Sequence, residues 1–211
     1  MKITSVIDDK SANVRVIIEN SGTEVTKTVT FKQYREACSA IGEYAAAIPR
    51  VGRLPQGFYD GGVSDGAYEA IIRVPAGKRP FFYFGKEYCI PFPELVFHFF
   101  QSAGEGRKTK VWAADEKGEL YRYPFGNVYS DARICWGQNV VPKVECMKDF
   151  DKLVSLFFSA STNDDMYHTI HTVIEGNEVS LRQRDLVEVL SRMEAFPIEW
   201  LHPFGLHIDK L

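Results

Sequence analysis

Apolar and polar residues alternate along residues 3–31, as in Val14-Arg15-Val16. A polar break at Asn20-Ser21-Gly22 separates two such runs. Alternation with a period of two is typical of half-buried strands, and a short polar break between two of them is typical of a tight turn. The pattern therefore predicts a β-hairpin over residues 14–31, with residues 3–7 as a third strand.

A helix is expected next, over Lys32–Ile48, because apolar residues recur there at intervals of three and four until a proline ends the run. Cys38 lies on the apolar stripe of this helix and is expected to pack there as a small hydrophobe. Residues 51–66 are rich in Gly, Pro and Asp and are predicted to form a loop. We therefore assign residues 1–50 to an N-terminal hairpin plus helix, and residues 51–211 to a second domain.

Short apolar and aromatic runs, separated by turn residues, follow from residue 67 onward. Strands at this spacing, joined by tight turns, are typical of an antiparallel meander. The predicted strands are Tyr68–Val74, Phe81–Phe84, Leu95–Phe100 and Lys110–Ala114. Within the third of them, His98 lies between two phenylalanines and is expected to be a hydrogen-bonded structural histidine.

Two amphipathic helices are predicted in the last third of the chain, over Asp149–Ala160 and over Leu181–Phe196. Ser180 is placed to be the N-cap of the second. The order of elements predicts an α+β fold, in which an antiparallel four-stranded meander packs on helices and carries an N-terminal β-hairpin extension.

Charge and composition exclude several classes of function. The net charge is -3 and the pI is about 6.0, with no basic cluster, so no nucleic-acid partner is expected. The start of the chain does not have the pattern of a signal peptide, and the longest apolar stretch, residues 90–100, is far shorter than a membrane span. No membrane partner is expected, and the location is predicted to be cytoplasmic. The four cysteines have no CxxC spacing and are interpreted as reduced thiols.

Candidate chemistry concentrates in one stretch, Tyr121–Asn139, where a polar turn is followed by Arg133 and a single cysteine, Cys135. A loop held by a sheet is a common place for functional side chains. A lone cysteine is nevertheless most often an inert packed residue. His168 and His171 have His-x-x-His spacing, which on a helix would bring two imidazoles onto one turn, but no further ligand completes a metal site.

A resemblance to a known family adds to this interpretation. Asn127 lies eight residues before Cys135, inside Tyr-Arg-Tyr-Pro-Phe-Gly-Asn-Val, and Ile134 and Trp136-Gly137 flank the cysteine. With Pro93-Glu94-Leu95-Val96-Phe97, these motifs resemble the active-site region of ubiquitin-conjugating enzymes. They are more similar to the prokaryotic ubiquitin-conjugating-enzyme-like family D, which includes the PRTRC system protein B group. The resemblance covers roughly residues 67–165.

This resemblance implies a ubiquitin-conjugating-enzyme-like fold and transfer of a ubiquitin-like protein. Cys135 would receive the modifier from an activating enzyme as a thioester and yield it to an amine. Asn127 would donate a hydrogen bond to the oxyanion of the tetrahedral intermediate. Either Asp131 or Asp164 would assist the incoming amine. The implied partners are a ubiquitin-like protein, an activating enzyme and a JAB-type protease of the same system, and no cofactor or metal is implied.

The sequence departs from the family pattern at two places. Phe125 and Gly126 stand where the His and Pro of the His-Pro-Asn motif lie in ubiquitin-conjugating enzymes, and Ser161 stands where a supporting histidine is typical of this branch. His168 or His171 is the candidate to replace that histidine. Two alternatives to the conjugating enzyme therefore remain open: an interaction module that keeps the fold without chemistry, and a cysteine hydrolase.

Overall fold

The computed structural model describes residues 2–7, 13–20, 23–46, 52–64, 66–102, 104 and 106–211. The chain divides into two compact units, Met1–Arg50 and Val51–Leu211, which are described separately below. None of the helices in the described ranges is long and apolar enough to cross a membrane.

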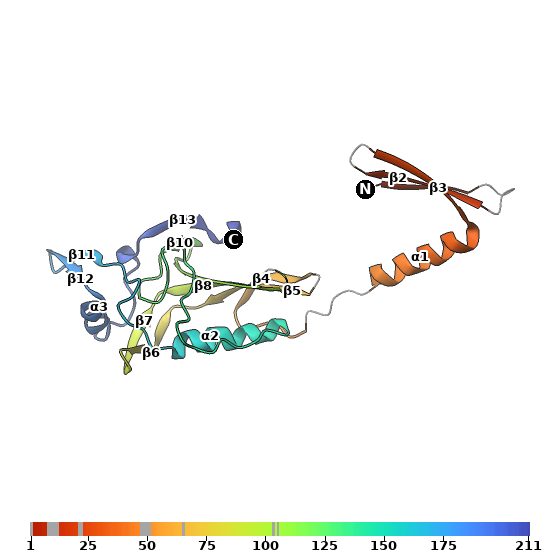
Figure 1. The fold of residues 1–211 in the computed structure, drawn as a ribbon. Coiled ribbons are helices and arrows are strands. Elements are labelled where there is room, and N and C mark those ends of the chain that lie inside the picture. Colours follow the sequence, from red (N-terminus) through yellow and green to blue (C-terminus); the bar gives the residue numbers. More distant parts are fainter. Residues whose placement is uncertain are drawn as a thin grey trace. The chain divides into compact units, whose positions relative to one another are not determined.

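The first unit contains a three-stranded antiparallel sheet and one helix (Figure 1). Its strands are β1 (Lys2–Ile7), β2 (Asn13–Asn20) and β3 (Thr23–Thr30), paired in that order, so the predicted hairpin and third strand are confirmed. Helix α1 (Phe31–Ala46) follows at the predicted place, and residues 47–50, where the helix was expected to end, lie outside the described residues. The prediction that Cys38 packs is wrong: α1 runs away from the end of β3, and Cys38 is exposed.

The second unit is built on a six-stranded antiparallel sheet of order β13-β10-β9-β8-β5-β4. The strands predicted from alternation are confirmed as β5 (Ala67–Val74), β8 (Glu94–Ser102) and β9 (Gly106–Ala114). The remaining strands of this sheet are β4 (Phe58–Ser64), β10 (Glu119–Tyr121) and β13 (Pro203–His207). His98 pairs with Glu69 at 2.7 Å, which confirms its structural role.

Two expectations about strands are corrected. The segment predicted to be a loop over residues 51–66 contains β4, which pairs with β5. The predicted strand Phe81–Phe84 belongs to β6 (Gly77–Tyr83), which leaves the main sheet and pairs with β7 (Lys86–Phe92) as a separate hairpin. The four-stranded meander is therefore a larger sheet with this hairpin inserted between β5 and β8.

The helices of the second unit are α2 (Phe150–Ser159), as predicted, and α3 (Gln183–Leu190), which is shorter than predicted. Short 3-10 turns occur at Met147–Asp149, Ile198–Trp200 and Ile208–Lys210. Ser180 is not an N-cap, because it lies in the hairpin of β11 (Ile170–Ile174) and β12 (Asn177–Leu181). His171 also lies in that hairpin, so the two histidines do not share a helical turn.

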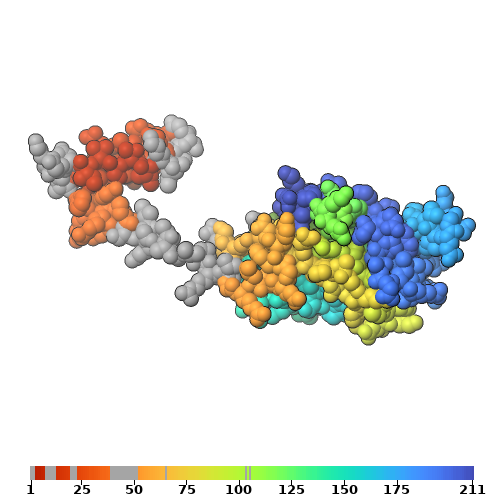
Figure 2. Space-filling model, turned by 180° about the vertical axis from the view of Figure 1, so that it is seen from behind, coloured from red at the N-terminus to blue at the C-terminus, as the bar shows by residue number. Residues whose placement is uncertain are grey.

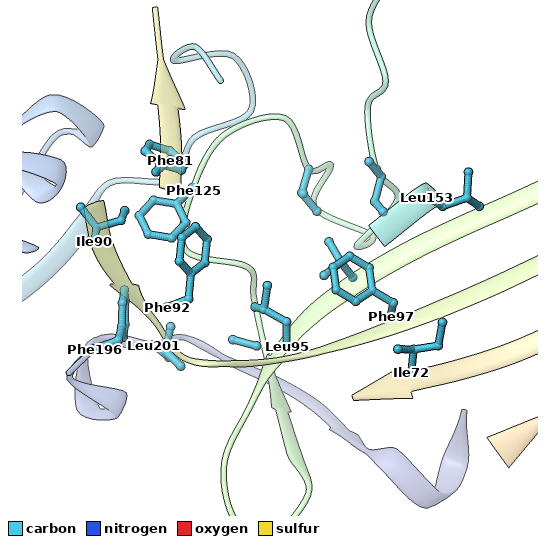
Figure 3. Close-up of a cluster of buried hydrophobic side chains, with 14 of the residues drawn as sticks. Ile72, Phe81, Ile90, Phe92, Leu95, Phe97, Phe125, Leu153, Phe196 and Leu201 are labelled. Atoms are coloured by element: carbon cyan, nitrogen blue, oxygen red, sulfur yellow. The ribbon is translucent and has the colours of Figure 1, made fainter. Parts of the chain in front are cut away.

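The alternation of side chains along the main sheet divides the core between its two faces. One face packs against α2 and includes Ile72, Leu95 and Phe97, which Figure 3 shows close to Leu153 and to the aromatic cluster around Phe125. The second face carries a smaller cluster, which contains Ile71, Val96, Trp112, Ala114, Leu120, Ala132 and Ile208. Because strands present successive side chains to opposite faces, both clusters follow from one alternating pattern.

Candidate functional site around Cys135

The loop that contains Cys135 is attached to the edge of β9, beyond the point where β10 ends. The N–H of Val111 donates to the carbonyl of Ala132 at 3.0 Å, and the N–H of Ile134 donates to the carbonyl of Thr109 at 3.0 Å. The side chain of Ala132 is buried in the smaller core cluster and that of Ile134 in the larger one. Because Ala132 and Ile134 are buried on opposite faces of the sheet, the next residue, Cys135, has a defined position.

A tight turn brings Asn127 and Cys135 opposite each other. Val128 and Ile134 form an antiparallel bridge, and the N–H of Cys135 donates to the carbonyl of Asn127 at 2.8 Å. The turn itself is closed by the N–H of Ala132, which donates to the carbonyl of Tyr129 at 2.9 Å. The spacing of eight residues that the sequence shows is therefore the length of a hairpin.

The thiol of Cys135 is partly exposed, and one side chain of the turn reaches it. The hydroxyl of Tyr129 donates to Sγ of Cys135 at 3.9 Å, a distance suited to a weak hydrogen bond to sulfur. This hydrogen bond is the main cause that raises the pKa of Tyr129 above its ordinary value. The reactive form of a cysteine is the thiolate, and among the described contacts this hydroxyl is the donor beside the sulfur.

Asn127 is held by both its backbone and its side chain. Its N–H donates to the carbonyl of Asp165 at 3.0 Å, and its Nδ2 donates to the carbonyl of Ser161 at 2.9 Å. Its φ of +64° lies in the left-handed region, which asparagine tolerates better than most residues. The segment 161–165 therefore fixes the position of Asn127, and through it the backbone of Cys135.

Gln183 joins the two segments that meet at Asn127. Its side chain is buried; Oε1 accepts from the N–H of Gly126, and Nε2 donates to the carbonyl of Asn163 at 2.6 Å. A Cβ on Gly126 would lie only 2.3 Å from that same carbonyl oxygen, so only glycine fits there. Sequence reasoning missed Gln183, because it lies 57 residues from Gly126 and no local pattern marks it.

The two candidate carboxylates have different surroundings. The carboxylate of Asp131 accepts from Nε of Arg133 at 2.6 Å. Burial raises the pKa of Asp131, but the hydrogen bonds and the charge of Arg133 outweigh burial, so the pKa of Asp131 lies below its ordinary value. Asp164 accepts from the hydroxyl of Tyr83 at 2.7 Å. Burial, followed by this hydrogen bond, raises the pKa of Tyr83 to about 12, so the phenol stays protonated and remains a donor. Asp131 lies on the turn with Cys135, whereas Asp164 holds the neighbouring segment.

His168 lies next to the turn. It lines a very small hollow together with Tyr129 and Ser130, and the described contacts include no hydrogen bond from it to Cys135. His171 bonds to Ser180 across the β11–β12 hairpin, at 2.8 Å. Within the described ranges no group of His, Cys, Asp or Glu side chains is arranged to hold a metal ion.

The second unit is an α+β structure, in which an antiparallel sheet is backed by a helix and a loop bonded to the sheet carries the partly exposed Cys135. The model of the family described as Prokaryotic E2 family D matches residues 64–204, and the chain belongs to this family. An E2-like fold and a role in ubiquitin-like conjugation are implied by this membership, with a ubiquitin-like modifier and an activating enzyme as the general partners. No curated protein and no solved structure shows significant similarity to the chain.

Proposed function

We propose that this protein carries a ubiquitin-like protein as a thioester on Cys135 and transfers it to an amine, within a bacterial ubiquitin-like or PRTRC-type system. The observation that carries the proposal is the placement of Cys135, partly exposed, opposite Asn127 and beside the hydroxyl of Tyr129. The family match lies inside the second unit, so we assign the chemistry to residues 51–211 and a separate role to residues 1–50.

The proposed reaction has two exchanges at one sulfur. The thiolate of Cys135 attacks the carbonyl carbon of the thioester between modifier and activating enzyme, and the sulfur of the activating enzyme leaves as a thiolate. An acceptor amine then attacks the carbonyl carbon of the new thioester, an amide bond forms, Cys135 leaves as a thiolate, and the proton lost by the amine passes to solvent. The hydroxyl of Tyr129 stabilises the negative charge on sulfur before the first exchange and after the second.

Asn127 and Asp131 have separate roles in this proposal. An amide nitrogen has two hydrogens, and the carbonyl of Ser161 accepts one of them, so the second is the donor we assign to the oxyanion. Asp131 is ionised on the same turn as the cysteine and is assigned to orient the incoming amine. His168 lines a small hollow with Tyr129 and Ser130, and it is the candidate to replace the supporting histidine of this branch.

The test uses the purified chain with the ubiquitin-like and activating proteins of the same system and ATP. Intact masses are measured without reductant. A modifier-sized adduct is expected that disappears with excess thiol and is absent from Cys135→Ala. Cys89→Ala and Cys146→Ala are matched controls, because both cysteines are exposed and both variants should keep the adduct.

Two results would contradict the proposal. An adduct that persists in Cys135→Ala would place the thioester on another cysteine. Absence of any adduct, while the activating enzyme itself is charged with modifier, would favour an interaction module that keeps the fold without transfer chemistry.

A further inference from the structure

A hollow of about 450 Å³ lies beside the loop that contains Cys135, where four chain segments meet. These segments are the residue that follows β10, the residues just before β11, β11 itself, and the start of β13 with the residue before it. Its lining residues are Arg122, His168, Thr169, His171, His202 and Pro203. The β11–β12 hairpin, which projects from the second unit in light blue in Figure 2, contributes one wall.

The lining of this hollow is rich in side chains that donate hydrogen bonds and can be positively charged. Three of the five histidines of the chain lie in it, together with one arginine. Its lining residues, all of which are described, include no aspartate or glutamate. Arginine presents a planar set of N–H donors that matches the oxygens of carboxylates and phosphates, and a histidine ring adds donors beside it. The complementary ligand is an oxyanion.

Two hydrogen bonds position residues of this hollow. The N–H of Arg122 donates to the carbonyl of His202 at 2.9 Å, which keeps the two residues adjacent. Nδ1 of His171 bonds Oγ of Ser180 at 2.8 Å, so the ring is fixed through one nitrogen while the other remains for a ligand. Because the ring of His171 is held before binding, it loses less entropy when a ligand arrives.

We propose that this hollow binds the carboxylate or phosphate group of an acidic protein partner. Arg122 and His168 also line the small hollow that contains Tyr129 and Ser130. Tyr129 in turn contacts the sulfur of Cys135. An acidic group bound by Arg122 therefore lies next to the turn that carries the candidate thiol, and the hollow would place an acidic partner beside it. Binding itself does not depend on transfer chemistry.

The test titrates the full chain, with no modifier present, at pH 7 and constant ionic strength, while the histidine ring signals are followed by NMR. The probes are inorganic phosphate and a blocked tri-glutamate peptide, with a blocked tri-glutamine peptide and chloride as controls. We expect the signals of His168, His171 and His202 to shift saturably with at least one oxyanion probe. The ring of His98, which bonds Glu69, should stay unchanged.

Arg122→Gln is the decisive variant. Its side chain is exposed, so the fold should tolerate the change, and binding should weaken at least about ten-fold, as expected for a lost charge-assisted hydrogen bond. Arg192→Gln, which removes an exposed cation outside the hollow, should leave binding unchanged, and His202→Gln is a second variant that should weaken it. Saturation by only one oxyanion probe would support the site and identify its ligand as phosphate or carboxylate. Shifts that do not saturate, or equal binding by Arg122→Gln and the wild type, would overturn the proposal.

Discussion

The N–H of Cys135 donates a hydrogen bond of 2.8 Å to the carbonyl of Asn127, so the two residues are paired through their backbones. Asn127 is in turn bonded to Ser161 and Asp165. The position of the thiol therefore depends on a segment about thirty residues further along the chain, as well as on its own turn. The predictions below separate these contributions.

Tyr129→Phe removes the hydroxyl that reaches the sulfur of Cys135 and leaves the ring in place. Loss of a hydrogen bond to the thiolate should slow alkylation of Cys135 by iodoacetamide about two- to ten-fold at pH 7.5, on the order of one ordinary hydrogen bond. Peptide mass spectrometry measures the rate at each cysteine. Alkylation of Cys89 and Cys146 should not change; a general change at all three would show that the substitution affects the fold instead.

The same contact predicts a change in the titration of Tyr129 itself. Its hydroxyl donates to sulfur only while protonated, which is the main reason why the pKa of Tyr129 is raised. Cys135→Ala should therefore lower the pKa of Tyr129 toward its ordinary value. NMR titration of the tyrosine ring signals measures it, and an unchanged pKa would mean that Cys135 is not the cause of the shift.

Gln183→Ala removes the side chain that joins Gly126 to Asn163. The N–H of Gly126 and the carbonyl of Asn163 would lose their partners in a largely buried place, so unfolding should become easier by about 2–4 kcal/mol. Urea denaturation followed by circular dichroism measures this difference. Gln138→Ala is the matched control, because Gln138 is exposed and its loss should cost less than about 0.5 kcal/mol.

The strands of the main sheet were predictable where alternation is strong, as in β5, β8 and β9. The strands β4, β7, β10, β11, β12 and β13 were not predicted. Two of them, β4 and β7, contain residues that are usual in turns. β4 contains Gly61-Gly62, yet a Cβ on Gly61 would lie 2.2 Å from the carbonyl oxygen of Glu69, so this glycine permits close strand pairing instead of a turn. β7 contains Pro91, a residue that is unusual inside a strand but is accommodated in this two-stranded hairpin.

The candidate site was predictable only in part, for a similar reason. The eight-residue interval between Asn127 and Cys135 is local and visible in the sequence, and the structure shows it as a closed hairpin. The contacts of Ser161, Asp165 and Gln183 with this hairpin connect positions 34 to 57 residues apart, and no periodicity or motif encodes such contacts. The roles of Cys135, Asn127, Asp131 and His168 in chemistry stay predictions.

Asp149 gives a prediction about pH. Its carboxylate bonds Nζ of Lys152 at 2.7 Å and accepts from the N–H of Glu145 at 2.9 Å, and these contacts lower its pKa to about 2. Because the pKa in the folded state is below its ordinary value, the ionised group stabilises the fold above about pH 4, and this contribution is lost as the pH falls toward 2.

The measurement compares the wild type with Asp149→Asn by urea denaturation at pH 7, 5 and 3. The variant should be less stable by about 1–2 kcal/mol at pH 7 and 5, and the difference should shrink at pH 3. Glu116→Gln, at an exposed position, should give no pH-dependent difference. A difference of equal size at all three values would mean that the charge of Asp149 does not stabilise the fold.

A substitution of Asn127 can separate its catalytic role from its structural role, provided that the new residue tolerates the backbone conformation at this position. Asn127→Ala would combine loss of the amide with strain at a φ of +64°, whereas Asn127→Gly removes the amide and adopts this conformation without cost. If the second amide hydrogen stabilises the oxyanion, Asn127→Gly should still form the thioester on Cys135 but discharge it to an amine about 10²–10³-fold more slowly. Single-turnover discharge of purified thioester, with urea denaturation in parallel, measures both quantities. Discharge at the wild-type rate would leave Asn127 with a purely structural role: its bonds to Ser161 and Asp165 would then serve only to hold the backbone of Cys135.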